Sequence, residues 1–203
     1  VEAKGTENQG GEIHILGNRV GLIDHALVDV SGKLGGGTAL IGGDYKGNGP
    51  VKTALRTYVG PDTVVRADAG ARGDGGKVVV WADEATRFEG GISSRGGEDV
   101  GNGGFTEVSA KKNLIFNGVV DLGADNGEAG TLLLDPDDLV IADGGDTDLV
   151  GTGNTDSQVF EFDEKDDANS EPSTIDAEAV TNALAVNDVE LQANNTIEVN
   201  EEV

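Results

Sequence analysis

Alternating apolar and polar residues recur along this chain, and each run is opened by one or two glycines. The run Phe105–Ser109 follows Gly103 and Gly104, and its Thr106 and Val108 share one face because successive strand residues point to opposite sides. Runs of the same kind occur at residues 12–16, 38–41, 77–81 and 131–134. The pattern predicts a repeated short strand.

The spacing of these runs predicts how the strands are arranged. The glycine next to each run lies at residues 11, 37, 76, 104 and 130, which gives spacings of 26, 39, 28 and 26 residues. Recurrence in this range, with a strand in each unit, is typical of a solenoid. When aligned, the runs form two columns that would stack as a core with a spacing of about 4.8 Å. The columns are Ile13, Ala39, Val78, Thr106, Leu132 and Ile15, Ile41, Val80, Val108, Leu134, and Thr106 is their one polar member.

Two further strand series repeat between the glycines. One series begins at Val28, Val65, Ile92 and Val120, with spacings of 37, 27 and 28 residues. A shorter apolar pair precedes each of these, at residues 22–23, 58–59, 87–88 and 115–116. An alternating strand also suits a sandwich, but matching spacings in separate series favour a parallel β-helix with coils of about 26–28 residues. The one long spacing places a loop excursion at residues 44–57.

The end of the chain follows a different plan. Residues 1–9 are polar and predicted to fray, and residues 10–142 form the β-helix. Residues 143–174 are predicted to form an acidic loop or flap. Asp176 then caps a short helix over Ala177–Ala185, with Val180 and Leu184 on one face. Strands at 189–192 and 196–199 follow, so residues 175–203 form a further coil or a strand-exchange segment.

Composition supports this all-β interpretation. The chain has 33 glycines and only 4% aromatic residues, which suits a solenoid because each coil buries only a thin column. There is no cysteine, so neither a disulfide framework nor a thiolate metal site is expected. No signal peptide or spanning apolar run is present, so no membrane insertion is expected. The chain starts at Val1 and has no methionine, which suggests a processed part of a longer precursor.

The net charge of the chain limits the classes of molecule that it is expected to bind. The net charge is −24, which argues against nucleic acid and anionic membranes and favours bound cations. The charge is uneven, because residues 131–203 carry 20 acidic residues and one basic residue.

Several phrases of the sequence resemble the filamentous-haemagglutinin-like exoproteins of two-partner secretion, in particular the large cyanobacterial-type members. They cover residues 10–142 strongly and 175–200 loosely. The phrases lie at residues 39–45, 56–61, 76–83, 86–88, 103–109 and 130–136. The resemblance implies a secreted, right-handed parallel β-helix with a role in adhesion, surface fibres or biofilm, and it supplies no catalytic residues. The family's Asn-Pro-Asn-Gly secretion motif is absent, so an interior or C-terminal segment is expected.

An acidic cluster is the candidate metal site, and Ca²⁺ is the candidate ion because it takes six to eight oxygen ligands. Its members are Asp135, Asp137, Asp138, Asp143, Asp146 and Asp148. Their spacing matches neither an EF-hand loop nor the Gly-Gly-x-Gly-x-Asp repeat. The competing interpretation is a set of solvated turn carboxylates.

Aromatic and paired acidic residues suggest two other kinds of site. Trp81, with Tyr45 and Tyr58, is a candidate for contact with a sugar or a partner surface, although such residues also cover coil edges. Asp29 and Asp121 occupy equivalent positions that could serve polysaccharide cleavage. Arg66 and Ser93 lie between them, which indicates a surface ladder instead of a cleft.

The sequence therefore predicts a non-enzymatic extracellular structural protein. Open strand edges at the two ends of a β-helix pair readily with another chain, so end-to-end joining or terminal strand exchange into a homopolymeric fibre is expected. A monomeric adhesin segment that binds surface glycans is the alternative. A polysaccharide-cleaving enzyme is the third possibility.

Overall fold

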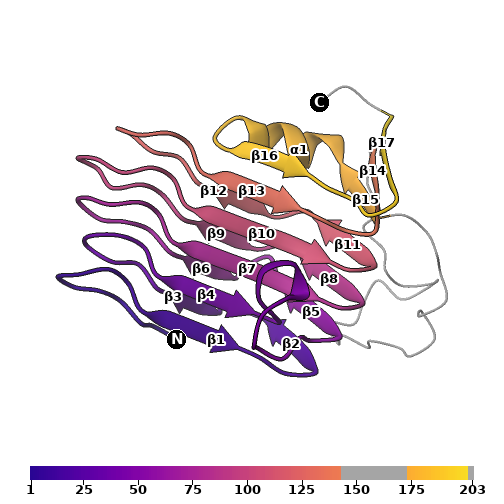
Figure 1. The fold of residues 1–203 in the computed structure, drawn as a ribbon, viewed down its shortest axis with the longest axis horizontal. Coiled ribbons are helices and arrows are strands. Elements are labelled where there is room, and N and C mark those ends of the chain that lie inside the picture. The colour runs from indigo at the N-terminus through magenta and orange to yellow at the C-terminus, as the bar shows by residue number, and fades with distance from the viewer. Residues whose placement is uncertain (143–172, 201–203) are drawn as a thin grey trace.

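A computed structural model describes residues 1–142 and 173–200 of the chain. Parallel strands stack in coils from β1 to β17, which is the arrangement expected of a β-solenoid (Figure 1). The one α-helix of the described residues, α1 (Ala177–Leu184), lies at the C-terminal end of the stack.

The longest sheet, called here the long sheet, contains the strands that follow the glycines. Its order is β1-β4-β7-β10-β13-β16, and every pair in it is parallel. The strands are β1 (Glu12–Ile15), β4 (Thr38–Ile41), β7 (Lys77–Ala82), β10 (Phe105–Ala110), β13 (Thr131–Leu134) and β16 (Asp188–Leu191). This confirms the predicted glycine-led strand series.

Two other sheets form the remaining sides of the coils. The second sheet contains β2 (Arg19–Leu22), β5 (Arg56–Val59), β8 (Ala85–Phe88) and β11 (Asn113–Phe116). The third contains β3 (Leu27–Asp29), β6 (Val64–Arg66), β9 (Gly91–Ser93) and β12 (Val119–Asp121). Val28, Val65, Ile92 and Val120 are register partners, as their spacing predicts.

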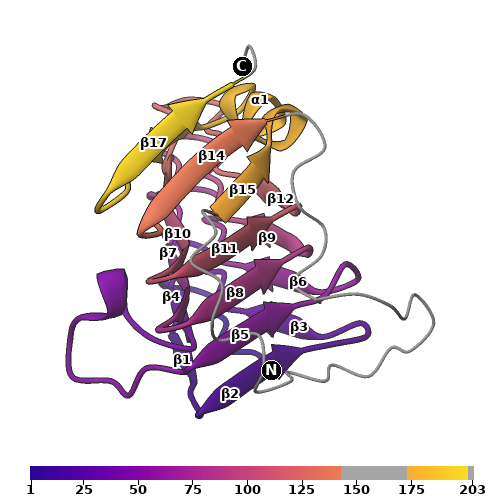
Figure 2. The same ribbon diagram turned by 90° about the vertical axis from the view of Figure 1, so that its right-hand side faces the viewer.

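The last coil departs from sequence order. Strand β14 (Asp138–Ala142) lies between β15 (Ser173–Asp176) and β17 (Thr196–Val199). Strand β15 packs next to β11, where the Ser173 hydroxyl oxygen accepts the Leu114 N–H at 2.8 Å. Figure 2 shows these three strands at the C-terminal end, above β11. Apart from residues 173 and 174, which begin β15, the predicted loop 143–174 lies outside the described residues.

Helix α1 closes part of this end. The Asp176 side chain accepts the Glu178 N–H at 2.8 Å, so the predicted N-cap is confirmed. Val180 is buried but Leu184 is exposed, so the two do not share one packed face as expected. Helix α1 packs against β12, β15 and β16, and its buried residues are Ala177, Val180 and Ala183, so Leu184 lies outside the packed face.

The core is the column arrangement expected from the repeat. Ile13, Ala39, Val78, Thr106 and Leu132 are register partners on successive strands of the long sheet, and all are buried. The rings of Phe88 and Phe116 stack between the second-sheet strands β8 and β11, with centroids 5.6 Å apart.

The glycines are explained by the corner between the long sheet and the third sheet. A Cβ on Gly103 would lie 1.7 Å from the Leu122 carbonyl oxygen, and one on Gly104 would lie 2.2 Å from that of Gly76. A side chain at Gly103 would collide with the backbone that follows β12, and one at Gly104 would collide with the backbone of the neighbouring coil. The repeat therefore needs glycine at this corner of each coil for close backbone approach.

Two boundaries differ from the sequence-based expectation. Arg56 and Thr57 belong to β5, so the predicted 44–57 excursion ends at Leu55. Residues 1–5, predicted to fray, lie beside β3, with the Ala3 N–H donating to the Asp29 carbonyl at 2.8 Å. The open edge of β3 gives this polar segment a backbone partner that composition alone does not reveal.

Candidate functional site: the outer face of the long sheet

Residues 42–55, called here the covering loop, lie across the outer face of the long sheet. The loop contains η1 (Tyr45–Gly47) and projects from the sheet between β4 and β5 (Figures 1 and 2). Asp44 caps η1, because its carboxylate accepts hydrogen bonds from the Tyr45 N–H at 2.7 Å and from the Lys77 ammonium at 2.6 Å. The Tyr45 ring meets the edge of Phe105, with centroids 5.8 Å apart. The loop is thus fastened to β7 and β10.

Lys46 is the central residue of the covering loop. Its φ of 54° is uncommon for a residue with a side chain and costs about 1 kcal/mol or more. This conformation is held by contacts to three separate coils. The Lys46 N–H donates to both carboxylate oxygens of Glu107 at 3.1 Å, and its ammonium lies 3.1 Å from Asp135 and contacts the Gln192 side chain.

Trp81 lies beneath the covering loop and is only 6% exposed. It belongs to a small apolar cluster outside the main core, with Leu40 and Val79 and the partly buried Val51 of the loop. A Cβ on Gly47 would lie 2.5 Å from the Trp81 ring, so glycine lets the loop backbone lie directly on the indole. The Trp81 indole N–H donates to the Asp83 carboxylate at 3.3 Å.

Glu107 is a fully buried carboxyl group on this outer face. Its register neighbours are Val79 on β7 and Leu133 on β13, and both are fully buried. Burial raises the pKa of Glu107 from 4.5 to about 7. The Lys46 N–H, the Ser109 hydroxyl and the Lys46 ammonium act in the opposite direction, while the Asp135 charge raises the pKa further.

A groove of about 690 Å³ lies between the covering loop and the last coil. Its polar side chains are two carboxylates, several amides and two ammonium groups, beside the Trp81 ring. They come from Lys46, Asn48, Asp83, Lys111, Asp135, Gln192 and Asn194. Planar amides and carboxylates beside an aromatic ring are groups that can hydrogen-bond the hydroxyls of a sugar.

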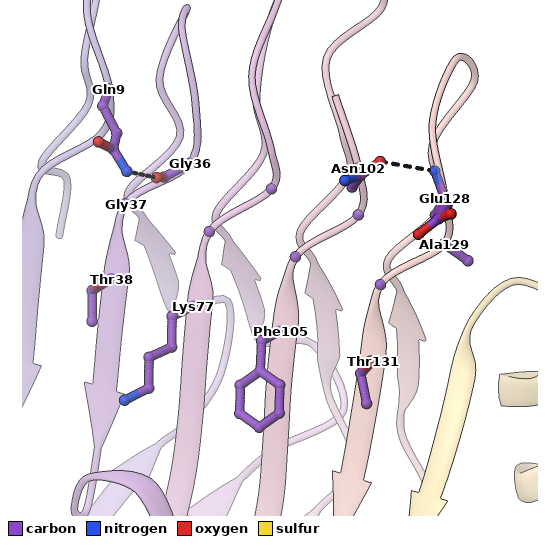
Figure 3. A pocket seen from close by; sticks show the side chains of 15 residues that line it. Gln9, Gly36, Gly37, Thr38, Lys77, Asn102, Phe105, Glu128, Ala129 and Thr131 are labelled. Atoms are coloured by element: carbon purple, nitrogen blue, oxygen red, sulfur yellow. Dashed lines mark hydrogen bonds between the residues drawn. The ribbon is translucent and has the colours of Figure 1, made fainter. Parts of the chain in front are cut away.

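A second hollow, of about 520 Å³, runs along the glycine corner (Figure 3). Glycine backbone forms much of its wall, and the side chains of Thr38, Lys77, Phe105 and Thr131 stand along it. Its own polar groups are partly paired, because Gln9 donates to the Gly36 carbonyl and the Glu128 N–H donates to Asn102, each at 3.0 Å.

The aromatic candidates fall on two different faces. Trp81 and Tyr45 both lie at the covering loop. Tyr58 lies on β5 of the second sheet, where its hydroxyl donates to Glu89 at 2.9 Å. Burial and Glu89 raise the pKa of Tyr58 to about 12. Tyr58 therefore takes no part in the groove.

The acidic cluster is described only in part. Asp135 pairs with Lys46, Asp137 accepts from Asn194 at 2.7 Å, and Asp138 accepts from Asn195 at 3.0 Å. Asp143, Asp146 and Asp148 lie outside the described residues. Within residues 1–142 and 173–200, no three His, Asp or Glu side chains gather in a way that could hold a metal ion. The calcium site stays a prediction.

The equivalent acidic pair is engaged in ion pairs. Asp29 lies 2.9 Å from the Lys4 ammonium, and Asp121 lies 2.8 Å from the Arg95 guanidinium. Each carboxylate thus has its own cation along the third sheet, as in a surface ladder.

Sequence reasoning missed Glu107 and Lys46. The available signal was the outward column Leu40, Val79, Glu107 and Leu133, which is apolar apart from Glu107. An apolar column on the outer face of a solenoid predicts that something covers it. The excursion was the nearest segment long enough to do so.

Neither a scan against protein-family models nor a search of the curated proteins found a match for this chain. Within the described part of the chain, no helix is both long enough and apolar enough to cross a membrane.

Proposed function

We propose that this chain is a non-enzymatic extracellular scaffold, a right-handed parallel β-helix of the filamentous-haemagglutinin-like type. It joins other copies through its sheet edges into a surface or matrix fibre with an adhesive role. The family and the handedness rest on the sequence phrases at residues 39–45, 76–83 and 103–109, and the secreted location follows from that resemblance.

The observation that carries the proposal is the open edge at each end of the long sheet. Among the described residues, no strand pairs with the outer edge of β1 or of β16. The Thr38 N–H donates to the Gly11 carbonyl, so Gly11, Ile13 and Ile15 face β4. The backbone groups of Glu12 and His14 therefore point outward.

On β16, the residues whose backbone groups point outward are placed so that they can pair with Glu12 and His14 of β1. The Asp188 N–H donates to the Gly130 carbonyl, so Asp188 and Glu190 face β13 and the backbone groups of Val189 and Leu191 point outward. A second copy can place β1 on β16 and continue both the ladder and the core columns. In the column next to this joint, β17 also has an edge that no other strand of the described part of the chain covers, and β2 is its counterpart at the other end.

Helix α1 limits the joint to these two sides. Asn187, just after α1, accepts the Leu122 N–H and donates to the Val120 carbonyl, which closes the edge of β12. The third side is therefore capped, and association uses β16 and β17.

A proline at position 14 of β1, where the backbone N–H points outward, tests whether copies pair through this edge. His14→Pro removes one outward N–H and an exposed side chain, and it leaves every bond from β1 to β4 in place. At about 0.15 M salt, where repulsion between copies is screened, we expect filaments of the wild-type chain by negative-stain electron microscopy, filaments of His14→Ala, and only monomers of His14→Pro. Monomers of wild type, or filaments of His14→Pro, would contradict the proposal.

Repeating the microscopy with a Ca²⁺ chelator tests the acidic cluster. Loss of wild-type filaments would assign Ca²⁺ a place at the joints. Filaments that persist would leave strand pairing as the joint.

The groove beside Trp81 favours a second candidate function, the binding of surface glycans by a monomer. In that case the wild-type chain stays monomeric, and its Trp81 fluorescence changes when a polysaccharide is added.

A further inference from the structure

The covering loop encloses a carboxyl group that neither proposed function uses. Glu107 lies on the outer face of the long sheet, yet none of its surface is exposed. A buried carboxyl group without a dedicated counter-ion is stable when protonated and costly when charged. Of the loop that buries it, Val51 joins the Trp81 cluster, Tyr45 packs against Phe105, and Ala54 at the end of the loop belongs to the main core.

We propose that Glu107 and the covering loop form a proton-controlled latch. The loop lies closed over Trp81 while Glu107 holds its proton, and it opens when the proton is lost. Opening uncovers the apolar row of Leu40, Val79 and Trp81, which the loop shields in the closed state.

The direction follows from the groups that surround Glu107. On its own strand the Ser109 hydroxyl is a hydrogen-bond partner, and the oxygen of that hydroxyl also accepts the Asp135 N–H at 3.1 Å. From the loop come the Lys46 N–H and ammonium, but that ammonium lies against Asp135 and Gln192. Lys77 of β7 is paired with Asp44, and Glu190 of β16 is exposed. Among the residues that the structure describes, no cation is therefore committed to a charged Glu107.

The difference in the pKa of Glu107 between the open and the closed state sets the pH range over which the loop opens. In the open state Glu107 meets water and has an ordinary pKa near 4.5, whereas in the closed state its pKa is about 7. The closed state binds the proton more tightly, so closure is favoured at low pH. The ratio of open to closed chains rises from about pH 4.5 to about pH 7, by roughly a few hundredfold in total, and then levels off.

Trp81 is the only tryptophan of the chain and lies directly under the loop, so it reports opening without labelling. We would measure acrylamide quenching of its fluorescence from about pH 5 to about pH 9, with far-ultraviolet circular dichroism on the same samples. Quenching is expected to increase at least about twofold across the window, while the β-sheet signal stays constant.

Two variants make the test specific. Glu107→Gln is a permanent mimic of the protonated form, because its amide can accept from Lys46 and donate to Ser109, so its quenching should stay low at every pH. Glu128→Gln removes an exposed carboxylate at a distant turn and should behave as wild type. The latch is overturned by pH-independent quenching of wild type, by a transition that Glu107→Gln retains, or by loss of the sheet signal with the rise in quenching.

Discussion

Thr106 is the polar member of an otherwise apolar column, and its hydroxyl is an unsatisfied buried group. It is fully buried between Val78 and Leu132, and within residues 1–142 and 173–200 its Oγ1 has no hydrogen-bond partner. A buried hydroxyl without a partner loses the hydrogen bonds that water gave it and gains nothing in return. The residue weakens the column that its methyl group helps to fill.

Thr106→Val should therefore stabilise the protein by about 1 kcal/mol. The change replaces the hydroxyl with a methyl group of similar shape, and urea unfolding followed by circular dichroism measures the result. The matched control is Thr57→Val, because Thr57 is equally buried but donates to the Trp81 carbonyl at 2.7 Å. That change should destabilise by about 1 kcal/mol, since it leaves the carbonyl unpaired. A loss of stability in Thr106→Val would show that its hydroxyl has a partner.

Residue identity predicted the interior of the coils better than their exterior. The inward columns follow from strand alternation and the period, so Ile13, Ala39 and Val78 could be aligned before any coordinates. The outer face could not be assigned in this way, because burial of Glu107 depends on a loop contact 61 residues away in sequence. The same holds for Trp81, whose partner Gly47 is identified only by the path of the loop.

At the scale of the element, α1 with Asn187 replaces the strand that the third sheet would otherwise add. Asn187 is 5% exposed and makes three hydrogen bonds. Its Oδ1 accepts the Leu122 N–H at 2.6 Å, and its Nδ2 donates to the Val120 carbonyl at 2.9 Å and the Ala183 carbonyl at 2.8 Å. One side chain thereby satisfies backbone groups that an uncapped β12 edge would leave open.

Asn187→Ala should destabilise the protein by about 2–3 kcal/mol, because it leaves the buried Val120 carbonyl of β12 and the buried Leu122 N–H just after β12 without their partner. Thermal unfolding gives the change in stability, and hydrogen exchange should show faster exchange at Leu122 in particular. Asn182→Ala serves as the control, since Asn182 is exposed on α1 and alanine favours a helix. Equal behaviour of the two variants would mean that α1 does not cap the third sheet.

The elements themselves show which part of the fold the sequence could predict. The three strand series and α1 were predicted because each combines a local signal with a fixed spacing or an N-cap. The placement of β15 between β11 and β14 was not predicted. It depends on pairing between Leu139–Ala142 and Ser173–Asp176, which no repeat in the sequence indicates. A strand that is inserted out of sequence order adds no periodic signal to the amino-acid sequence.

At the scale of the whole molecule, charge opposes the association that the open edges favour. The chain has a net charge of −24, so copies repel one another at low ionic strength. The joint itself adds to the repulsion. Continued in register, the column from Glu12 to Asp188 would bring these two carboxylates of neighbouring copies side by side.

Assembly should therefore increase with salt. The screening length falls from about 30 Å at 0.01 M salt to about 8 Å at 0.15 M, so repulsion between copies weakens while backbone pairing is little affected. Light scattering and sedimentation should show monomers at the low salt concentration and larger species at the high one.

Glu12→Gln with Asp188→Asn should shift assembly to lower salt, because like charges opposite one another destabilise a strand pair. Asp62→Asn with Glu128→Gln removes the same charge from exposed turns and should shift it much less. Assembly that is strongest at low salt would mean that ionic attraction holds the copies together, and β1 would then not lie on β16 in this register.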